Sequence, residues 1–143
     1  MLDPKLIFNT NTSCKVGQKA SFTKTIEACD VYQFAGISGD FNPAHLDEVH
    51  GSRSMFKTRI AHGMITAGLI SGAITMKIPG AGSVIKKQTV SFKKPVLFGD
   101  TVTVNLEVLE LNSNTARLAT TCVNQANEVV VVGEVTVELP QAI

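Results

Sequence analysis

The stretch His62–Met76, HGMITAGLISGAITM, decides the fold, because it contains no acidic or basic side chain apart from His62. A helix that is apolar on every face is typical of a buried helix and not of a surface helix. Gly63, Gly68 and Gly72 interrupt the stretch, and each interior glycine costs roughly 1 kcal/mol relative to alanine. Close approach of another backbone would offset that cost. The stretch therefore predicts a buried helix packed tightly against neighbouring main chain.

The residues after this helix have the alternation of β-strands. Residues 101–108 alternate polar and apolar side chains with a period of two, which is typical of a half-buried strand. Three further strand candidates are 83–96, 116–122 and 129–139, the last with a bend at Gly133. Because short turns join these strands, we expect them to form an antiparallel sheet.

One further helix completes the predicted fold. Residues 27–37 carry apolar side chains at helical spacing, with Thr25 as N-cap. The sequence has no repeat, linker or low-complexity tract, so we expect one domain over 1–143. A buried helix and about five antiparallel strands predict an α+β hot-dog fold, in which the antiparallel sheet wraps around the central helix.

Composition excludes several classes of function. Of the 143 residues, 44% are hydrophobic, and the net charge of +1 offers no footprint for nucleic acid or an acidic membrane surface. The apolar stretches are shorter than the ~18 residues of a membrane span, and Met1–Lys5 does not resemble the start of a signal peptide. Cys14, Cys29 and Cys122 are widely spaced without a CxxC pair. They predict reduced thiols in the cytoplasm and neither disulfides nor a zinc site.

The segment Phe34–His45, FAGISGDFNPAH, carries the candidate chemistry. A glycine and a proline bracket Asp40 and Asn42, so we expect the chain to leave the helix and turn here. An acid and a base on a rigid turn can hold a water molecule and divide the two proton transfers that adding or removing water requires. Spacing alone favours a plainer alternative, in which Asp40 caps a turn and His45 is an ordinary surface histidine.

The heptad Gly39–His45, GDFNPAH, resembles the hydratase-2 motif of the MaoC-like family, which includes (R)-specific enoyl-CoA hydratases and related dehydratases. The segments Arg59–Met64 and Ser91–Val96 also resemble this family, so the resemblance covers nearly the whole chain. The chain departs from the family at Ala44, where a larger aliphatic residue is more usual, and at Gly51, where Ala or Ser is common. These departures concern local packing and acyl preference, since neither position supplies a reacting group.

The resemblance implies reversible syn addition of water to a trans-2-enoyl-CoA, which gives the (R)-3-hydroxyacyl-CoA. It makes Asp40 the base that takes a proton from the water, and His45 the residue that orients the water and helps to deliver a proton to C2. It makes the backbone N–H of Gly63 the oxyanion donor, since the first N–H groups of a helix are unpaired and lie at the positive end of its dipole. The alternative for Gly63 is a tight packing contact.

Four more residues are assigned to the substrate-binding site: Asn42, His62, Ser71 and Ile74. We expect Asn42 to organise the loop and His62 to fix the loop before the central helix. The hydroxyl of Ser71 either supports Asp40 or bonds to the carbonyl four residues earlier. Ile74 either lines the acyl tunnel or packs in the core. Possible partners of the coenzyme A phosphates are Arg53, Arg59, Lys86, Lys87, Lys93 and Lys94.

The resemblance further implies a homodimer joined edge to edge, and composition predicts a cytoplasmic protein. The sequence has no Gly-rich phosphate loop and no metal-ligand cluster, so we expect no metal or other cofactor. One alternative is a 3-hydroxyacyl-[acyl-carrier-protein] dehydratase that runs the same chemistry in reverse, which a basic docking patch would favour. Another is a non-catalytic acyl-thioester binding domain, which replacement of Asp40 or His45 would favour. A thioesterase would need an acid or nucleophile on the central helix, and residues 62–76 contain no Asp or Glu.

Overall fold

The computed structural model describes residues 14–141, so Met1–Lys5 lies outside the described part of the chain. Five strands form one sheet in the order β1-β3-β4-β5-β2, and every neighbouring pair is antiparallel. The strands are β1 (Lys19–Thr25), β2 (Val84–Phe92), β3 (Thr101–Leu111), β4 (Thr115–Val123) and β5 (Val129–Glu138). The predicted antiparallel sheet is confirmed, and the last four of these strands lie where the alternation placed them.

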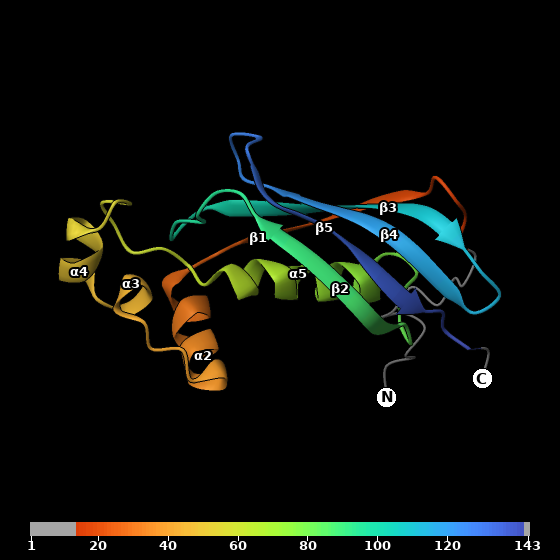
Figure 1. Cartoon of the computed structure of the whole chain (residues 1–143), viewed down its shortest axis with the longest axis horizontal. Coiled ribbons are helices and arrows are strands. Elements are labelled where there is room, and N and C mark those ends of the chain that lie inside the picture. Colours follow the sequence, from red (N-terminus) through yellow and green to blue (C-terminus); the bar gives the residue numbers. More distant parts are fainter. Residues whose placement is uncertain (1–13, 142–143) are drawn as a thin grey trace, which may run out of the picture.

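The helices occupy two places (Figure 1). They are α2 (Ala28–Ser38), α3 (Pro43–Leu46), α4 (Glu48–Arg53) and α5 (Gly63–Met76). The helix α5 runs along one face of the sheet, whereas α2, α3 and α4 gather beyond one end of it. This is the predicted hot-dog arrangement. Within 14–141, no helix combines the length and hydropathy that crossing a bilayer requires.

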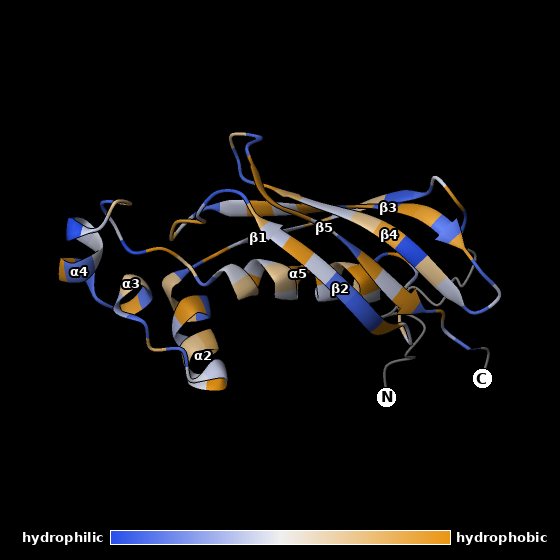
Figure 2. Ribbon diagram, viewed as in Figure 1, coloured by the Kyte–Doolittle hydropathy of each residue, from blue (hydrophilic) through white to orange (hydrophobic). Residues whose placement is uncertain are grey.

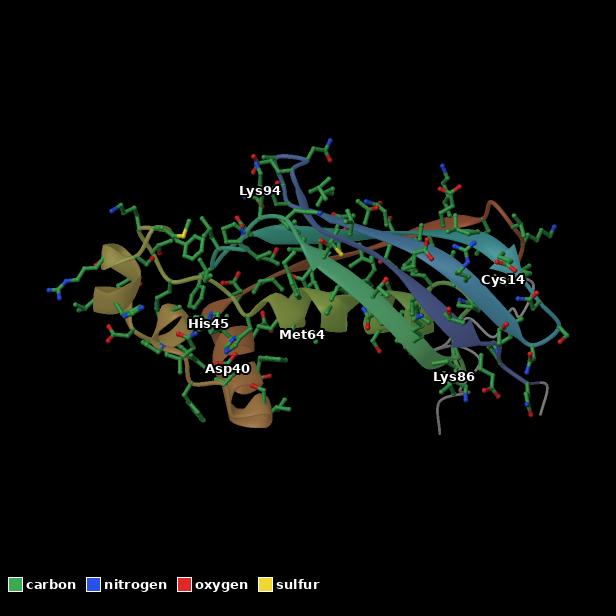
Figure 3. All side chains as sticks on the ribbon, viewed as in Figure 1. Cys14, Asp40, His45, Met64, Lys86 and Lys94 are labelled. Atoms are coloured by element: carbon green, nitrogen blue, oxygen red, sulfur yellow. The ribbon has the colours of Figure 1, made fainter. Side chains whose placement is uncertain are left out.

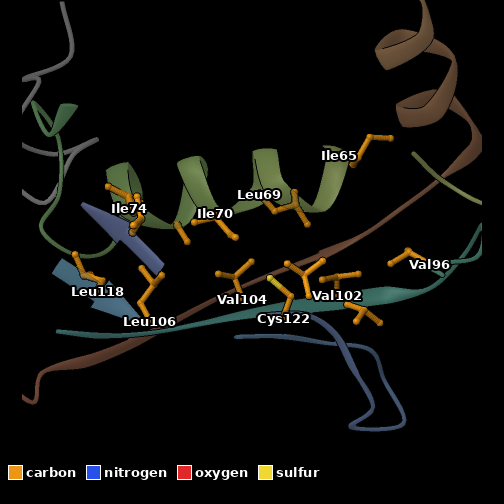
Figure 4. Packing of buried hydrophobic residues seen from close by; sticks show 14 of the residues in the cluster. Ile65, Leu69, Ile70, Ile74, Val96, Val102, Val104, Leu106, Leu118 and Cys122 are labelled. Carbon is orange, nitrogen blue, oxygen red and sulfur yellow. The ribbon is translucent and has the colours of Figure 1, made fainter. Parts of the chain in front are cut away.

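The core lies between α5 and the sheet (Figure 4). Strand β3 buries every second residue from Val102 to Val108, and Figure 2 shows the corresponding bands of high and low hydropathy along the strands. From the helix, Ile70 and Ile74 are almost completely buried and belong to the same cluster. Truncating either to alanine typically costs about 2–5 kcal/mol, because a cavity remains.

The expectation that α5 is buried on every side is wrong for the described chain. Seven of its fourteen residues are buried, but Gly68 and Ser71 are exposed and Met64 is 55% exposed. A five-stranded sheet covers one side of a helix only, and the other side here carries small residues that hydropathy does not distinguish from core. The exposed side of α5 is therefore an uncovered face of the chain.

The expected backbone contact at the helix glycines is also wrong. A Cβ added at Gly68 would meet no atom within 4 Å, and one added at Gly72 would meet only the ring of Phe22, at 3.8 Å. A Cβ at Gly63 would lie 2.7 Å from the Phe92 ring, which is again a side chain. No neighbouring main chain within 14–141 therefore explains these three glycines.

Close backbone approach occurs instead at Gly133. Pairing continues through this residue on both sides, to Thr120 and to Val90, so the strand is not interrupted there. A Cβ at Gly133 would lie 1.8 Å from the carbonyl oxygen of Thr89. The glycine therefore serves the close approach of β2, and we find no break in the strand at the predicted bend.

The start of α2 differs from the prediction. Its N-cap is Glu27, in a capping box with Asp30, and Thr25 belongs to the end of β1. The hydroxyl of Thr25 is hydrogen-bonded to that of Thr101 on β3 at 2.8 Å, so it is not available to the helix. The carboxylate of Asp30 accepts from the Glu27 N–H at 2.8 Å and from Lys24 at 2.9 Å.

Candidate active site

The turn after α2 holds its shape through short side-chain to main-chain hydrogen bonds. Helix α2 ends at Gly39, which has a φ of 76° that favours glycine. The Asp40 carboxylate accepts from the Asn42 N–H at 3.1 Å, and the Asn42 side chain in turn accepts from the Ala44 N–H at 3.0 Å. Pro43 then begins α3, where its missing N–H costs nothing. Asn42 thus organises the loop, as expected.

His45 lies on α3 and not on an open loop, and its side chain is only 12% exposed. Its Nδ1 is 2.8 Å from the carbonyl oxygen of Ile60. A carbonyl only accepts, so Nδ1 carries the proton, and Nε2 faces the Asp40 carboxylate. Nε2 and Oδ2 of Asp40 are 3.9 Å apart. This distance is too long for a direct hydrogen bond and short enough for one water to contact both groups. Figure 3 shows the two residues together at one end of the molecule.

His62 lies behind this pair. It is 2% exposed, and its Nε2 donates to the carbonyl oxygen of Asp40 at 2.9 Å. Its ring lies against that of His45 and is tilted against that of Phe34, with centroids 3.9 Å and 4.8 Å away. Nδ1 of His62 is buried without a hydrogen-bond partner. These contacts match the expected role of fixing the loop before α5, and they leave no exposed atom for a substrate.

Asp40, His45 and His62 bring three possible metal-ligand atoms within 4.8 Å of one another. Nε2 of His62 donates its proton to the Asp40 carbonyl, so this nitrogen has no lone pair to offer a cation. The Asp40 side chain is 48% exposed and keeps Oδ2 accessible to solvent. The arrangement is therefore better suited to hold a water than a metal ion.

A cavity of about 450 Å³ adjoins His45. It is of a size to hold part of a small ligand. Its lining residues are mainly apolar and come from the turn before α5, the start of α5 and the end of β2: His45, Phe56, Ile60, Ala61, Gly63, Met64, Thr66, Phe92, Lys93, Lys94, Pro95, Val96 and Val131. The cavity thus runs from His45 to the first turn of α5.

The first turn of α5 offers free donors to this cavity. Its N-cap, His62, makes no side-chain hydrogen bond to the helix, and within the described residues the N–H groups of Gly63 and Met64 have no acceptor. Such groups carry the positive end of the helix dipole. Because Gly63 has no side chain, its N–H is accessible from the cavity.

Ser71 and Ile74 lie farther along α5. Ser71 is eight residues after Gly63, roughly 12 Å along the helix axis at 1.5 Å per residue. It makes neither of the two expected hydrogen bonds: none joins it to Asp40, and the carbonyl of Ala67 accepts instead from Gln88 at 3.3 Å. Ile74 is 1% exposed within the core cluster and does not line the cavity. The structure places neither of them beside the Asp40–His45 pair.

Three of the six cations proposed for phosphate are already paired with carboxylates: Arg59 with Glu48, Lys86 with Glu138 and Lys94 with Glu128. Lys86 also lies at the opposite end of the molecule from Asp40 and His45 (Figure 3). Lys93 lines the cavity. No ion pair within 14–141 involves Arg53, Lys87 or Lys93.

Arg59 is held on several sides. Its Nε donates to Glu48 at 2.9 Å and its Nη1 to the hydroxyl of Tyr32 at 2.7 Å. The guanidinium also lies over the ring of Phe98, 4.6 Å from the centroid. The hydrogen bond to Tyr32, followed by that to Glu48, raises the pKa of Arg59. Two of its nitrogens are therefore already bonded to groups of the fold.

Sequence reasoning missed two features of this site. The carbonyl of Ile60 orients His45, and a main-chain oxygen leaves no signature in residue type. Phe92 covers Gly63, and its contact follows from how β2 lies against α5.

Comparison with known proteins decides the family. The family model for the MaoC like domain matches residues 10–132. The chain belongs to the MaoC-like family. It is 44% identical over 137 residues to an (R)-specific enoyl-CoA hydratase of Rhodospirillum rubrum, covering 94% of each chain. It is 46% identical over 129 residues to a 3-hydroxybutyryl-CoA dehydratase of Methylorubrum extorquens, covering 89% of this chain and 82% of that protein.

A solved structure agrees with these relatives. The unliganded R-hydratase PhaJ1 of Pseudomonas aeruginosa superimposes with a TM-score of 0.86 at 46% identity, covering 90% of this chain and 84% of that one.

Proposed function

We propose that this MaoC-like protein is an (R)-specific enoyl-CoA hydratase, a hydro-lyase that adds water reversibly to trans-2-enoyl-CoA. One observation carries the proposal: the carboxylate of Asp40 and Nε2 of His45 lie 3.9 Å apart, and His45 lines a cavity that extends to the free N–H groups at the start of α5. The similarity to the hydratase of Rhodospirillum rubrum and the dehydratase of Methylorubrum extorquens supports the same chemistry.

In the proposed reaction, Asp40 and His45 share one water. Asp40 takes a proton from this water as its oxygen bonds to C3 of the substrate, and the C2–C3 π electrons move toward the thioester carbonyl. Asp40 passes this proton to Nε2 of His45, whose Nδ1–H stays bonded to the Ile60 carbonyl. Nε2 then gives the proton to C2, so both residues end in the protonation states in which they began. Addition from one side of the double bond gives the syn product.

Charge that develops on the thioester oxygen needs hydrogen-bond donors that are already in place. The N–H of Gly63 suits this task, since it lies at the start of α5 and has no acceptor within the described chain. Losing such a donor typically costs 10²–10³-fold in kcat, or about 3–4 kcal/mol. Dehydration of a 3-hydroxyacyl thioester uses the same three groups in reverse.

We further propose a cytoplasmic homodimer joined through β2. This strand is one edge of the sheet, and a free edge invites pairing with another chain. Phe92 on β2 and Met64 on α5 are both about half exposed although both line the cavity, so a partner here would cover the open side of the site. Free thiols at Cys14, Cys29 and Cys122 fit a reducing compartment. A stable, active monomer in sedimentation would overturn the dimer.

The direct test is loss of absorbance at the enoyl-thioester band with purified protein and crotonyl-CoA, with a stereospecific dehydrogenase to identify the product. We expect rapid loss and formation of the (R)-alcohol. Turnover of a carrier-protein thioester without turnover of crotonyl-CoA or a longer enoyl-CoA would replace the hydratase by a carrier-protein dehydratase. Binding of an acyl-CoA without turnover of either carrier form would make the protein a binding domain.

A further inference from the structure

We propose that Arg59 is a positioning residue for His45, which holds the main chain that orients the catalytic imidazole. This inference rests on the proposed function of His45. It also gives the guanidinium of Arg59 a task other than the phosphate contact expected from the sequence.

The main chain of one residue, Ile60, contacts α3 at two places. Its carbonyl oxygen accepts from Nδ1 of His45 at 2.8 Å, and its N–H donates to the carbonyl of Ala44 at 3.1 Å. The first contact sets the tautomer of His45 and the direction of its ring. The second fixes the position of α3 relative to the main chain of Ile60. The position of Nε2 relative to Asp40 therefore follows the position of Ile60.

Few side-chain contacts within the core hold helix α3 in its position. It is four residues long, and none of its residues is fully buried. A single helical turn is not stable in isolation, because fixing the dihedral angles of the first turn costs more free energy than its hydrogen bond contributes. The orientation of His45 therefore depends on contacts from outside α3, and the Ile60 carbonyl is the main-chain group that its ring contacts.

Arg59 precedes Ile60 and ties this main chain to three other parts of the fold. Its side chain bonds to Tyr32 on α2 at 2.7 Å and to Glu48 on α4 at 2.9 Å, and lies over the ring of Phe98. Two separate donors of one planar group reach acceptors on two helices, which a lysine ammonium cannot reproduce with the same geometry. The side chain is 21% exposed.

Gly51 shows how closely α4 lies against the same main chain. A Cβ at Gly51 would be 2.7 Å from the Arg59 nitrogen and 2.8 Å from the Thr58 carbonyl carbon. Glu48 lies three residues earlier on the same face of α4. The family usually has Ala or Ser at this position. Glycine here lets α4 approach this main chain closely enough for Glu48 to reach Arg59.

The test combines kinetics with the ring spectrum of His45. The chain has three histidines, so the ¹⁵N resonances of their rings can be assigned one by one. Arg59→Met removes both donors. We expect the wild-type His45 ring to show the Nδ1–H tautomer, and the variant to show a mixture. We also expect kcat to fall by about tenfold or more, with a smaller change in KM, because misplacement of a reacting group acts on the chemical step.

Two further variants show whether geometry is the cause. Arg59→Lys keeps a charge beside Glu48 and is expected to recover part of kcat and of the tautomer. Arg117→Met is the matched control, since Arg117 also bridges two carboxylates, those of Glu110 and Glu134, on the sheet. We expect it to leave kcat and the His45 spectrum unchanged.

Wild-type kcat and an unchanged His45 tautomer in Arg59→Met would overturn the proposal, even with a lower melting temperature. If that variant does not fold, Tyr32→Phe and Glu48→Gln each remove one contact, and wild-type kcat in both would overturn it. If the wild type hydrates no enoyl thioester, the proposed function fails, but the His45 spectrum of Arg59→Met still decides whether Arg59 positions the ring.

Discussion

The imidazole of His62 lies against that of His45, with ring centroids 3.9 Å apart and ring planes inclined by 30°. Each ring bonds to a different main-chain carbonyl, His45 to that of Ile60 and His62 to that of Asp40. The two histidines therefore connect the turn after α2 to the segment that enters α5. His45 faces the cavity, whereas His62 is buried behind it and holds the main chain of Asp40 in place.

Replacement of the acid–base pair is expected to abolish most turnover without unfolding the protein. Asp40→Asn and His45→Gln each remove one proton-transfer group while keeping the size of the side chain, so kcat is expected to fall by about 10²–10⁴-fold. Steady-state hydration of crotonyl-CoA measures this. His50→Gln is the control, because His50 is exposed on α4 and does not line the cavity. Near-normal turnover in either site variant would remove that residue from the catalytic role.

His62→Phe keeps a flat ring against His45 and removes the N–H that bonds to Asp40. The loss of this hydrogen bond is expected to cost about 1 kcal/mol of unfolding free energy and to lower kcat, because the Asp40 main chain gains freedom. KM is expected to change little, since His62 is 2% exposed and does not line the cavity. Denaturant unfolding and steady-state kinetics measure both effects. A raised KM with normal kcat would instead support the substrate contact that the sequence predicts.

The parts of this structure that the sequence predicts are those with a local pattern. Strand alternation and the apolar run of α5 show in neighbouring residues, and Asp40 and His45 lie five residues apart in one motif. Strand β1 was missed because Lys19–Thr25, KASFTKT, is short and largely polar at the sheet edge. The exposed face of α5 was missed because Gly68 and Ser71 do not reveal from hydropathy whether a neighbour covers them. The Ile60 carbonyl was missed because its role depends on a contact across fifteen residues.

The burial of each cysteine predicts which thiols react with an alkylating agent. Burial raises the pKa of the Cys122 thiol to about 12, so at pH 8 about one thiol in ten thousand is the reactive thiolate. Cys29 is exposed on α2. Iodoacetamide is therefore expected to label Cys29 in the folded protein, and Cys122 only after unfolding in guanidinium, as peptide mass spectrometry would show. Equal labelling rates in the native state would mean that the sheet opens around Cys122.

Two glycine substitutions are expected to change stability in opposite directions. Gly133→Ala would place a Cβ 1.8 Å from the Thr89 carbonyl oxygen, where only main chain can move, so we expect a loss of about 3 kcal/mol or more. Gly36→Ala lies within α2 with no atom near its Cβ, and a gain of about 0.5–1 kcal/mol is expected. Chemical denaturation of both variants decides this. Tolerance of alanine at Gly133 would contradict the register of β2 against β5.

Gly63→Ala separates the donor role of this residue from its lack of a side chain. The N–H is kept, but the new Cβ would lie 2.7 Å from the ring of Phe92. Phe92 is 51% exposed, so its ring can shift, and stability is expected to change by less than about 0.5 kcal/mol. The displaced ring narrows the cavity, and kcat/KM for crotonyl-CoA is expected to fall by about tenfold.

The double variant Gly63→Ala/Phe92→Leu tests that cause. The smaller side chain at residue 92 removes the contact, so we expect it to restore most of kcat/KM, with Phe92→Leu alone as the control. If the double variant stays as slow as Gly63→Ala, steric narrowing is not the cause. The methyl group would then act on the first turn of α5 itself, by moving the N–H that the thioester oxygen needs.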